Sequence, residues 1–96
     1  MGYRYEFLEA AAKDLFKLTQ HNERFLHAIV TLHIPAILRD PYAAGDPKKG
    51  ALAHVRAYDV TIKGVAYRIL YEVTGDVVTF IAIGPHDAAY ERAKRR

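Results

Sequence analysis

The start of the chain combines a strand-like pattern with a helix-like one. Aromatic and charged residues alternate from Tyr3 to Phe7, which predicts a half-buried β-strand. Apolar residues then recur at helical spacing, at Leu8, Ala11, Leu15 and Leu18. This spacing predicts an amphipathic helix that ends near Thr19-Gln20 and carries polar residues elsewhere on its wheel, among them Lys13, Asp14 and Lys17.

A second helix-like pattern follows after Asn22, whose side chain suits an N-cap. One apolar stripe is formed by Phe25, Ile29, Leu32 and Ala36, and it is widened by Leu26 and Val30. We expect Pro35 to kink or interrupt this helix, because proline lacks the N–H that an interior position needs. Asp40-Pro41 should end it, because the residue before a proline avoids the helical region.

The second half of the chain predicts strands. Residues 41–50 are rich in Pro and Gly and form a loop, after which the runs 58–63 and 67–73 alternate apolar with polar side chains. A third run, 77–83, is mostly apolar. The order is β-α-α-β-β-β. It predicts an α+β fold in which two N-terminal helices pack on one face of an antiparallel twisted sheet, followed by a short basic C-terminal helix or tail.

The first hairpin of this sheet has a functional consequence. If Lys63-Gly64 is a two-residue loop, Asp59 lies directly opposite Arg68. Thr61, Lys63 and Glu72 then share their face, so the face without helices is expected to be polar. One explanation of such a face is that antiparallel sheets commonly expose one side to solvent. The other explanation is a shallow functional site on this face, ringed by Arg68, Lys63, His86 and the tail.

Length and charge limit the choices further. The chain has 96 residues, which predicts one domain spanning 1–96, and its net charge of +3 fits a polyanionic partner without requiring one. Basic residues are concentrated in one loop and at the end of the chain, at Lys48, Lys49, Arg92, Lys94, Arg95 and Arg96. The basic tail either is solvated or contacts a polyanion or an acidic protein.

The chain contains no cysteine, which excludes disulfides and thiolate metal sites. Its start lacks a signal-peptide pattern, and its apolar runs are too short to span a bilayer. A cytoplasmic protein without membrane contact is the simplest interpretation. The histidines His21, His27 and His33 are spaced by six residues and do not share a helix face, so we expect no metal site.

The segment after the third strand carries the candidate chemistry. His86 and Tyr90 follow directly where that strand ends, a place where side chains are held rigidly yet stay accessible. Histidine exchanges a proton near neutral pH, and tyrosine can stack on a base. Either residue could instead have a structural role, His86 in a turn and Tyr90 packed on the sheet.

In three motifs the chain resembles the RelE/ParE superfamily of toxins from bacterial type II toxin–antitoxin pairs. The motifs are the helix end Ile37-Leu38-Arg39-Asp40-Pro41, the run Tyr67-Arg68-Ile69-Leu70-Tyr71-Glu72-Val73, and the ending Ile83-Gly84-Pro85-His86-Asp87-Ala88-Ala89-Tyr90. The resemblance to the RelE branch implies an enzyme that cuts mRNA in the ribosomal A site and is silenced by an antitoxin. Because the RNA supplies its own 2′-hydroxyl as nucleophile, the resemblance implies no metal and no cofactor.

The resemblance also assigns roles within the site. It implies that Arg68 contacts the scissile phosphate and that Tyr90 stacks on or orients the attacked nucleotide. His86 stands where the RelE branch often has arginine, and some relatives instead have a histidine near the C-terminus that serves as general acid. RelE-type enzymes carry lysines on the first strand of the meander, where this chain has Asp59 and Thr61. Asp59 is therefore either the general base or an ion-pair partner of Arg68. Positive charge for RNA binding would come from Arg56, Lys63, Lys48, Lys49 and Lys94.

Three functions remain open at this level. The first is a ribosome-dependent mRNA endoribonuclease, which His86 and Tyr90 favour. The others are a ParE-like inhibitor of DNA gyrase and a catalytically inactive antitoxin-binding relative, which the missing lysines favour. The expected partners are a cognate antitoxin, with a heterotetramer as a candidate assembly, and, for the first function, mRNA and the ribosome.

Overall fold

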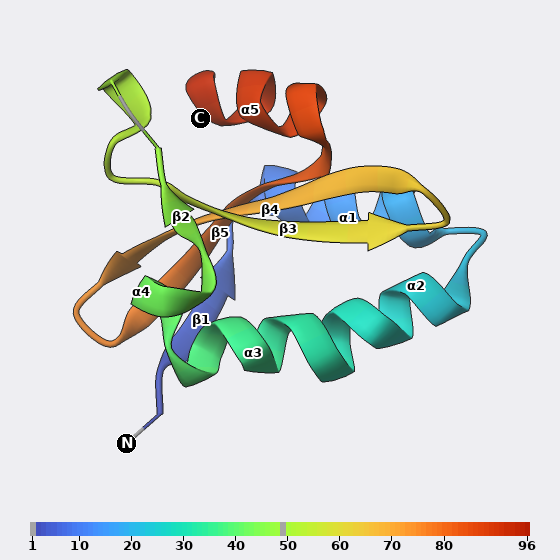
Figure 1. The fold of residues 1–96 in the computed structure, drawn as a ribbon, viewed down its shortest axis with the longest axis horizontal. Coiled ribbons are helices and arrows are strands. Elements are labelled where there is room, and N and C mark those ends of the chain that lie inside the picture. The colour runs from blue at the N-terminus through green and yellow to red at the C-terminus, as the bar shows by residue number, and fades with distance from the viewer. Residues whose placement is uncertain (1, 49) are drawn as a thin grey trace.

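The computed structural model describes residues 2–48 and 50–96, with the side chains of Ala51 and His86 left out. Figure 1 shows a central sheet with helices on both sides. In the described residues, no helix has the length and apolar character needed to cross a membrane. In chain order the elements are β1 (Arg4–Phe7), α1 (Glu9–Thr19), α2 (Glu23–Ala28), a π-helical turn (Ile29–His33), α3 (Ile34–Arg39), α4 (Pro41–Ala44), β2 (Asp46–Pro47), a 3₁₀ turn (Gly50–Leu52), β3 (Arg56–Ile62), β4 (Val65–Thr74), β5 (Val77–Pro85) and α5 (His86–Lys94).

The predicted α+β fold is confirmed, and the sheet has the strand order β1-β5-β4-β3-β2. The strands β3, β4 and β5 form the expected antiparallel meander. The sheet as a whole is mixed, because β1 pairs with β5 in parallel. A parallel pair needs a long crossover between its strands, and here that connection contains the N-terminal helices. The loop predicted at 41–50 contains α4 and β2 within its described residues.

The hairpin between β3 and β4 has the predicted register. Lys63 and Gly64 have φ angles of 50° and 80°, as a tight turn with two left-handed residues requires. Asp59 consequently lies opposite Arg68. On the next strand, Arg68 lies opposite Gly84, which brings the start of α5 near the same end of β4.

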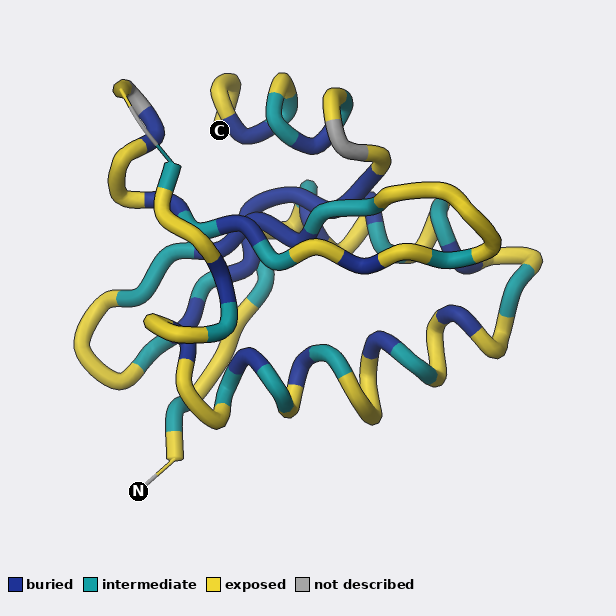
Figure 2. Tube along the Cα trace, viewed as in Figure 1, coloured by how far each residue is buried: buried dark blue, intermediate teal, exposed yellow. Residues whose placement is uncertain are grey.

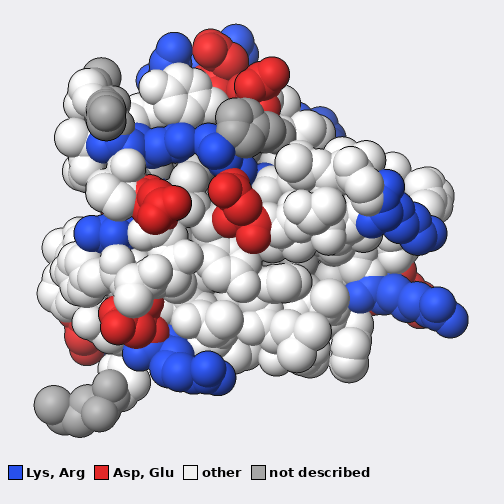
Figure 3. Space-filling model, viewed as in Figure 1, with Lys and Arg blue, Asp and Glu red and all other residues white. Residues whose placement is uncertain are grey.

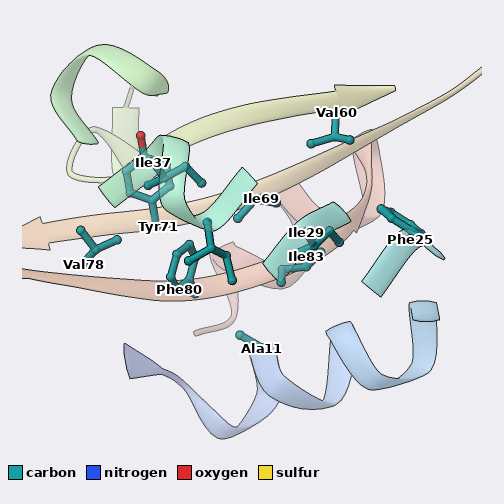
Figure 4. Packing of buried hydrophobic residues seen from close by; sticks show 11 residues of the cluster. Ala11, Phe25, Ile29, Ile37, Val60, Ile69, Tyr71, Val78, Phe80 and Ile83 are labelled. Carbon is teal, nitrogen blue, oxygen red and sulfur yellow. The ribbon is translucent and has the colours of Figure 1, made fainter. Parts of the chain in front are cut away.

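One face of the sheet, which we call the helical face, packs against α1 and the α2–α3 segment (α2, the π-helical turn and α3). Figure 4 shows large side chains meeting there, among them Phe80, Tyr71 and Ile69. Phe80 is fully buried, and its ring stacks on Phe7 with centroids 4.7 Å apart. The Tyr71 hydroxyl donates a hydrogen bond of 2.6 Å to the carbonyl of Pro41, so the core also fixes the start of α4.

The π-helical turn changes which residues of the second helix are buried. The side chains facing the core are Phe25, Ile29, Ile34 and Ile37, with a step of five residues between Ile29 and Ile34. An extra residue in a π-turn rotates the following positions around the helix axis. The predicted stripe is therefore wrong at Leu32, which is 64% exposed. Leu26 and Val30, which were expected to widen the stripe, are also exposed. The turn ends two residues before Pro35 and is the predicted interruption, while Asn22 caps the helix as expected.

The opposite face, which we call the α5 face, is not free of helices. There α5 lies over Ala57, Leu70 and Ala82, and its own buried residues are Ala89 and Ala93. A register shift between Leu70 and Tyr71 makes Ile81 an extra residue in β5, so that Ile81 and its neighbour Ala82 both join this cluster. Figure 2 shows the buried sides of α5 and of the α2–α3 segment facing the sheet from opposite directions. The expectation that this face is polar and without helices was wrong in the part that α5 covers, because alternation alone does not reveal where a later helix packs.

Candidate functional site

A hollow of about 310 Å³ opens between β4, α5 and Lys48, the residue that follows β2. Two of the predicted site residues, Arg68 and Tyr90, line it together with the predicted RNA-binding residue Lys48. Asp87 and Glu91 also line it. Residues that are far apart in sequence thus meet at one place on the α5 face. Of the residues expected to ring a site there, Arg68 lines this hollow.

Arg68 is held by its partner on the neighbouring strand. Its Nε atom donates a hydrogen bond of 2.7 Å to Oδ1 of Asp59. The Arg68 side chain is 16% exposed, against 61% for that of Asp59. Within the described part of the chain, no hydrogen bond holds the two terminal nitrogens of the guanidinium, and these nitrogens could form a fork around phosphate oxygens. Of the two roles left open for Asp59, the geometry agrees with the ion-pair partner.

Lysine side chains gather around Tyr90. The ammonium of Lys48 lies 5.4 Å from the centre of the Tyr90 ring, and that of Lys94 lies 4.8 Å from it. Cations at such distances are attracted to the electron-rich face of the ring. Lys94 also pairs with Glu91 at 3.4 Å. An anion that enters the hollow would therefore meet a half-buried aromatic ring together with Lys48 and Arg68.

Other predicted site residues lie elsewhere or outside the described part. Arg56 alternates onto the helical face and donates hydrogen bonds to the carbonyls of Tyr42 and Gly45, at 2.7 and 2.9 Å. Lys63 is in the β3–β4 turn and does not line the hollow. Lys49 lies outside the described residues, as does the side chain of His86. The backbone places His86 at the first position of α5, one helical turn before Tyr90.

Sequence reasoning missed Asp14, which was assigned to the polar side of α1. This residue is 8% exposed and accepts a hydrogen bond of 3.1 Å from the backbone N–H of Ile83. Arg96 donates to it at 2.6 Å, and Arg92 approaches it within 3.4 Å. The basic tail is thus partly folded back onto α1. A signal was present, since Asp14 stands at helical spacing from the apolar residues Ala11 and Leu18.

The charges around the site are mixed. Figure 3 shows Lys and Arg side chains interspersed with Asp and Glu over the visible face. Among the described residues, no three His, Asp or Glu side chains are grouped so that they could hold a metal ion. His33, one of the helix histidines, instead places Nδ1 2.9 Å from the Tyr58 hydroxyl, and burial lowers the pKa of His33.

Solved structures of several bacterial toxins are similar to this chain. The RelBE2 toxin–antitoxin complex from Mycobacterium tuberculosis contains a chain with 26% identity and a TM-score of 0.72, and the match covers 90% of this chain and 100% of that one. A double mutant of Escherichia coli RelE in the free state has 26% identity and a TM-score of 0.62, with 100% and 98% covered. A YoeB/ParE toxin from Agrobacterium tumefaciens shares the fold at 22% identity and a TM-score of 0.70, with 86% and 98% covered.

A family comparison extends over almost the whole chain. No individually curated protein matches it in sequence. One family profile does match, over residues 7–94, and this span includes β3, β4, β5 and α5. The chain belongs to the family of ParE-like toxins of type II bacterial toxin–antitoxin systems, within the RelE/ParE superfamily.

Proposed function

We propose that this toxin is a ribosome-dependent mRNA endoribonuclease that inhibits translation. The observation that carries the proposal is the hollow on the α5 face, where Arg68, Lys48 and Tyr90 come together. Phosphate and base recognition need a cation next to an aromatic surface. The resemblance to the RelE branch supplies the substrate, and the solved toxin–antitoxin complexes among similar structures support a cognate antitoxin as the regulatory partner.

In the proposed reaction the RNA 2′-oxygen attacks the adjacent phosphorus, and the bond from phosphorus to the 5′-oxygen breaks. The products are a 2′,3′-cyclic phosphate and a 5′-hydroxyl. A general base takes the 2′-hydroxyl proton, and a general acid donates a proton to the leaving 5′-oxygen. His86 is the proposed acid. Arg68 and Lys48 stabilise the negative charge that grows on the phosphate.

The remaining residues of the hollow have supporting roles in this proposal. Tyr90 stacks on or orients the attacked nucleotide, and its neighbour Lys94 adds positive charge. Asp59 keeps the Arg68 guanidinium in one orientation through the 2.7 Å hydrogen bond. Lys63 and Arg56 remain predicted RNA contacts away from the hollow. Lys49, which lies outside the described residues, also remains a predicted contact.

A second candidate, inhibition of DNA gyrase by binding, is favoured by the acidic residues in and beside the hollow. Asp87 and Glu91 line it, and Asp59 stands on β3 where a lysine was expected. These carboxylates oppose RNA binding electrostatically. A catalytically inactive, antitoxin-binding relative is the third alternative, and the same experiment separates all three.

The test is induced expression in a bacterium, with 5′ ends mapped on translated and untranslated messages. We expect growth arrest and codon-registered cuts confined to translated messages, both lost in Arg68→Ala and in His86→Ala. Arg24→Ala, which removes an exposed arginine of α2, is the matched control and should remain toxic. Growth arrest with intact mRNA and inhibited gyrase would overturn the proposal in favour of the second candidate. No arrest at all would favour the third.

A further inference from the structure

We propose that Asp14 is a positioning residue for the hollow. Through Arg92 and Arg96 it holds α5 in the place where Tyr90 meets Lys48 and Arg68. The inference rests on the proposed function for its effect on RNA cleavage. Its effect on the position of Tyr90 does not depend on which reaction the toxin carries out.

Apolar packing alone gives α5 a poorly directed attachment. Among the described side chains of α5, the buried ones are those of Ala89 and Ala93, which pack in one cluster with Leu70 and Ile81, and Tyr90 is partly buried beside them. Hydrophobic stabilisation is roughly proportional to the apolar area removed from water. It is also non-directional, so it does not by itself fix the rotation or the shift of a short helix.

Directed contacts come from the edge of β5. Pairing with β1 ends at Phe80, and past this point three backbone groups of β5 bond to side chains. The N–H of Ile83 donates to Asp14, the carbonyl of Ile83 accepts from Arg92 at 2.9 Å, and the carbonyl of Ile81 accepts from Arg96 at 2.8 Å. Buried backbone groups need such partners. The carboxylate of Asp14 thus joins α1, β5 and the end of α5.

The cluster is close-packed and partly withdrawn from water. The Asp14 side chain is 9% exposed, that of Arg96 is 19% exposed and that of Arg92 is 39% exposed. A Cβ atom added at Gly84 would lie 2.7 Å from Nη1 of Arg92, so glycine leaves the room that this guanidinium occupies. Removing one partner from a buried ion pair leaves the other uncompensated. The arrangement of α5 therefore depends on the charge of Asp14.

One short helix, α5, contributes residues to both the cluster and the hollow. Arg92 follows Tyr90 by two residues, and Arg96 comes just beyond the helix end at Lys94. The other end of α5 is fixed because it follows β5 directly. Tyr90 therefore lies between two attachment points, and losing the second one frees the ring to move away from Lys48 and Arg68.

The main test is Asp14→Asn, which keeps the shape and a hydrogen-bond acceptor but removes the charge. Glu9→Gln makes the same chemical change at an exposed position of α1 and is the matched control. Purified proteins labelled with 3-fluorotyrosine are compared by ¹⁹F NMR, with the Tyr90 and Tyr71 signals assigned through Tyr90→Phe and Tyr71→Phe. Tyr71 reports on the helical face, because it is fully buried there.

In Asp14→Asn we expect the Tyr90 signal to broaden or shift toward that of an unfolded chain, while the Tyr71 signal stays unchanged. Cleavage of mRNA should fall by about 100-fold, because a displacement of about 1 Å at a catalytic site has that effect. Glu9→Gln should change neither. Arg96→Gln should reproduce the Tyr90 change, and adding it to Asp14→Asn should produce less than the sum of the two effects.

An unchanged Tyr90 signal in Asp14→Asn would overturn the inference. So would equal changes at Tyr90 and Tyr71, which indicate general destabilisation. If Asp14→Asn fails to fold, Arg96→Gln decides, because it leaves Asp14 paired with Arg92 and the Ile83 N–H. If the Tyr90 signal responds but the chain cuts no RNA, the proposed function fails while the positioning role of Asp14 stands.

Discussion

On the helical face of the sheet, two layers of large side chains such as Phe80, Tyr71 and Ile29 meet in one continuous core. On the α5 face, the described side chains that attach a short helix are smaller: two buried alanines, the half-buried Tyr90 and a cluster of charged groups around Asp14. The candidate site lies on this second, thinner face. The contrast suggests that stability and function are separated by the sheet, since burial of large side chains dominates the first face and directed polar contacts dominate the second.

The largest effect should come from breaking the helical face. In Phe80→Ala we expect the free energy of unfolding to fall by about 3 to 5 kcal/mol, because a fully buried aromatic ring is replaced by a cavity. Chemical denaturation measures this loss. Phe16→Ala removes a ring that is 69% exposed and serves as the control. Equal losses in the two variants would contradict the assignment of the main core to this face.

Alkaline pH should weaken the same face through Tyr71. Burial raises the pKa of Tyr71 to about 12 from the ordinary value of 10.0. The neutral phenol is therefore favoured in the folded state, and its contribution is complete below pH 10 and lost as the pH rises toward 12. The loss is about 2 to 3 kcal/mol over that range. Denaturation curves of the wild type and Tyr71→Phe at each pH should show this slope in the wild type only.

Overpacking the α5 face should affect toxicity far more than it affects the stability of the fold. Ala89 is fully buried, so Ala89→Leu should lift α5 from the sheet and lower the free energy of unfolding by about 1 to 3 kcal/mol. Growth arrest should be lost completely, because Tyr90 moves with the helix. Ala43→Leu, at an exposed position of α4, should leave both properties intact. A folded Ala89→Leu protein that still arrests growth would show that the position of α5 does not matter.

The smallest change in stability is expected at the rim of the hollow. Asp59→Asn should alter the free energy of unfolding by less than about 1 kcal/mol, because Asp59 is an exposed partner. If Asp59 only orients Arg68, RNA cleavage should fall by about tenfold, the loss expected for a charge-assisted hydrogen bond. The pH profile of RNA cleavage by Asp59→Asn should then keep the shape of the wild-type profile. A loss of ~100-fold or more with a missing limb of the pH profile would identify Asp59 as the general base.

Much of the fold could be predicted because its signals are local. The Lys63-Gly64 turn sets the register that pairs Asp59 with Arg68, and Asn22 and Asp40 mark helix boundaries through hydrogen bonds to residues three positions away. The position of Leu32 was predicted wrongly because the π-helical turn changes the helical spacing before Pro35, and the spacing of apolar residues does not show such a turn. Asp14 was missed because its partners lie 69 and 82 residues further along the chain.

For the candidate site, the sequence by itself determined the residue types and their strands: Arg68 on β4, Asp59 opposite it, and His86 and Tyr90 after β5. Alternation and turn chemistry suffice for that, because they act over a few residues. Only the tertiary structure decided that Lys48 lies beside Tyr90 and that Arg56 bonds to backbone carbonyls on the helical face. It also decided that the basic C-terminal segment forms a helix whose end is attached to Asp14. Such contacts depend on which distant groups can be buried and hydrogen-bonded together, and no local pattern encodes that choice.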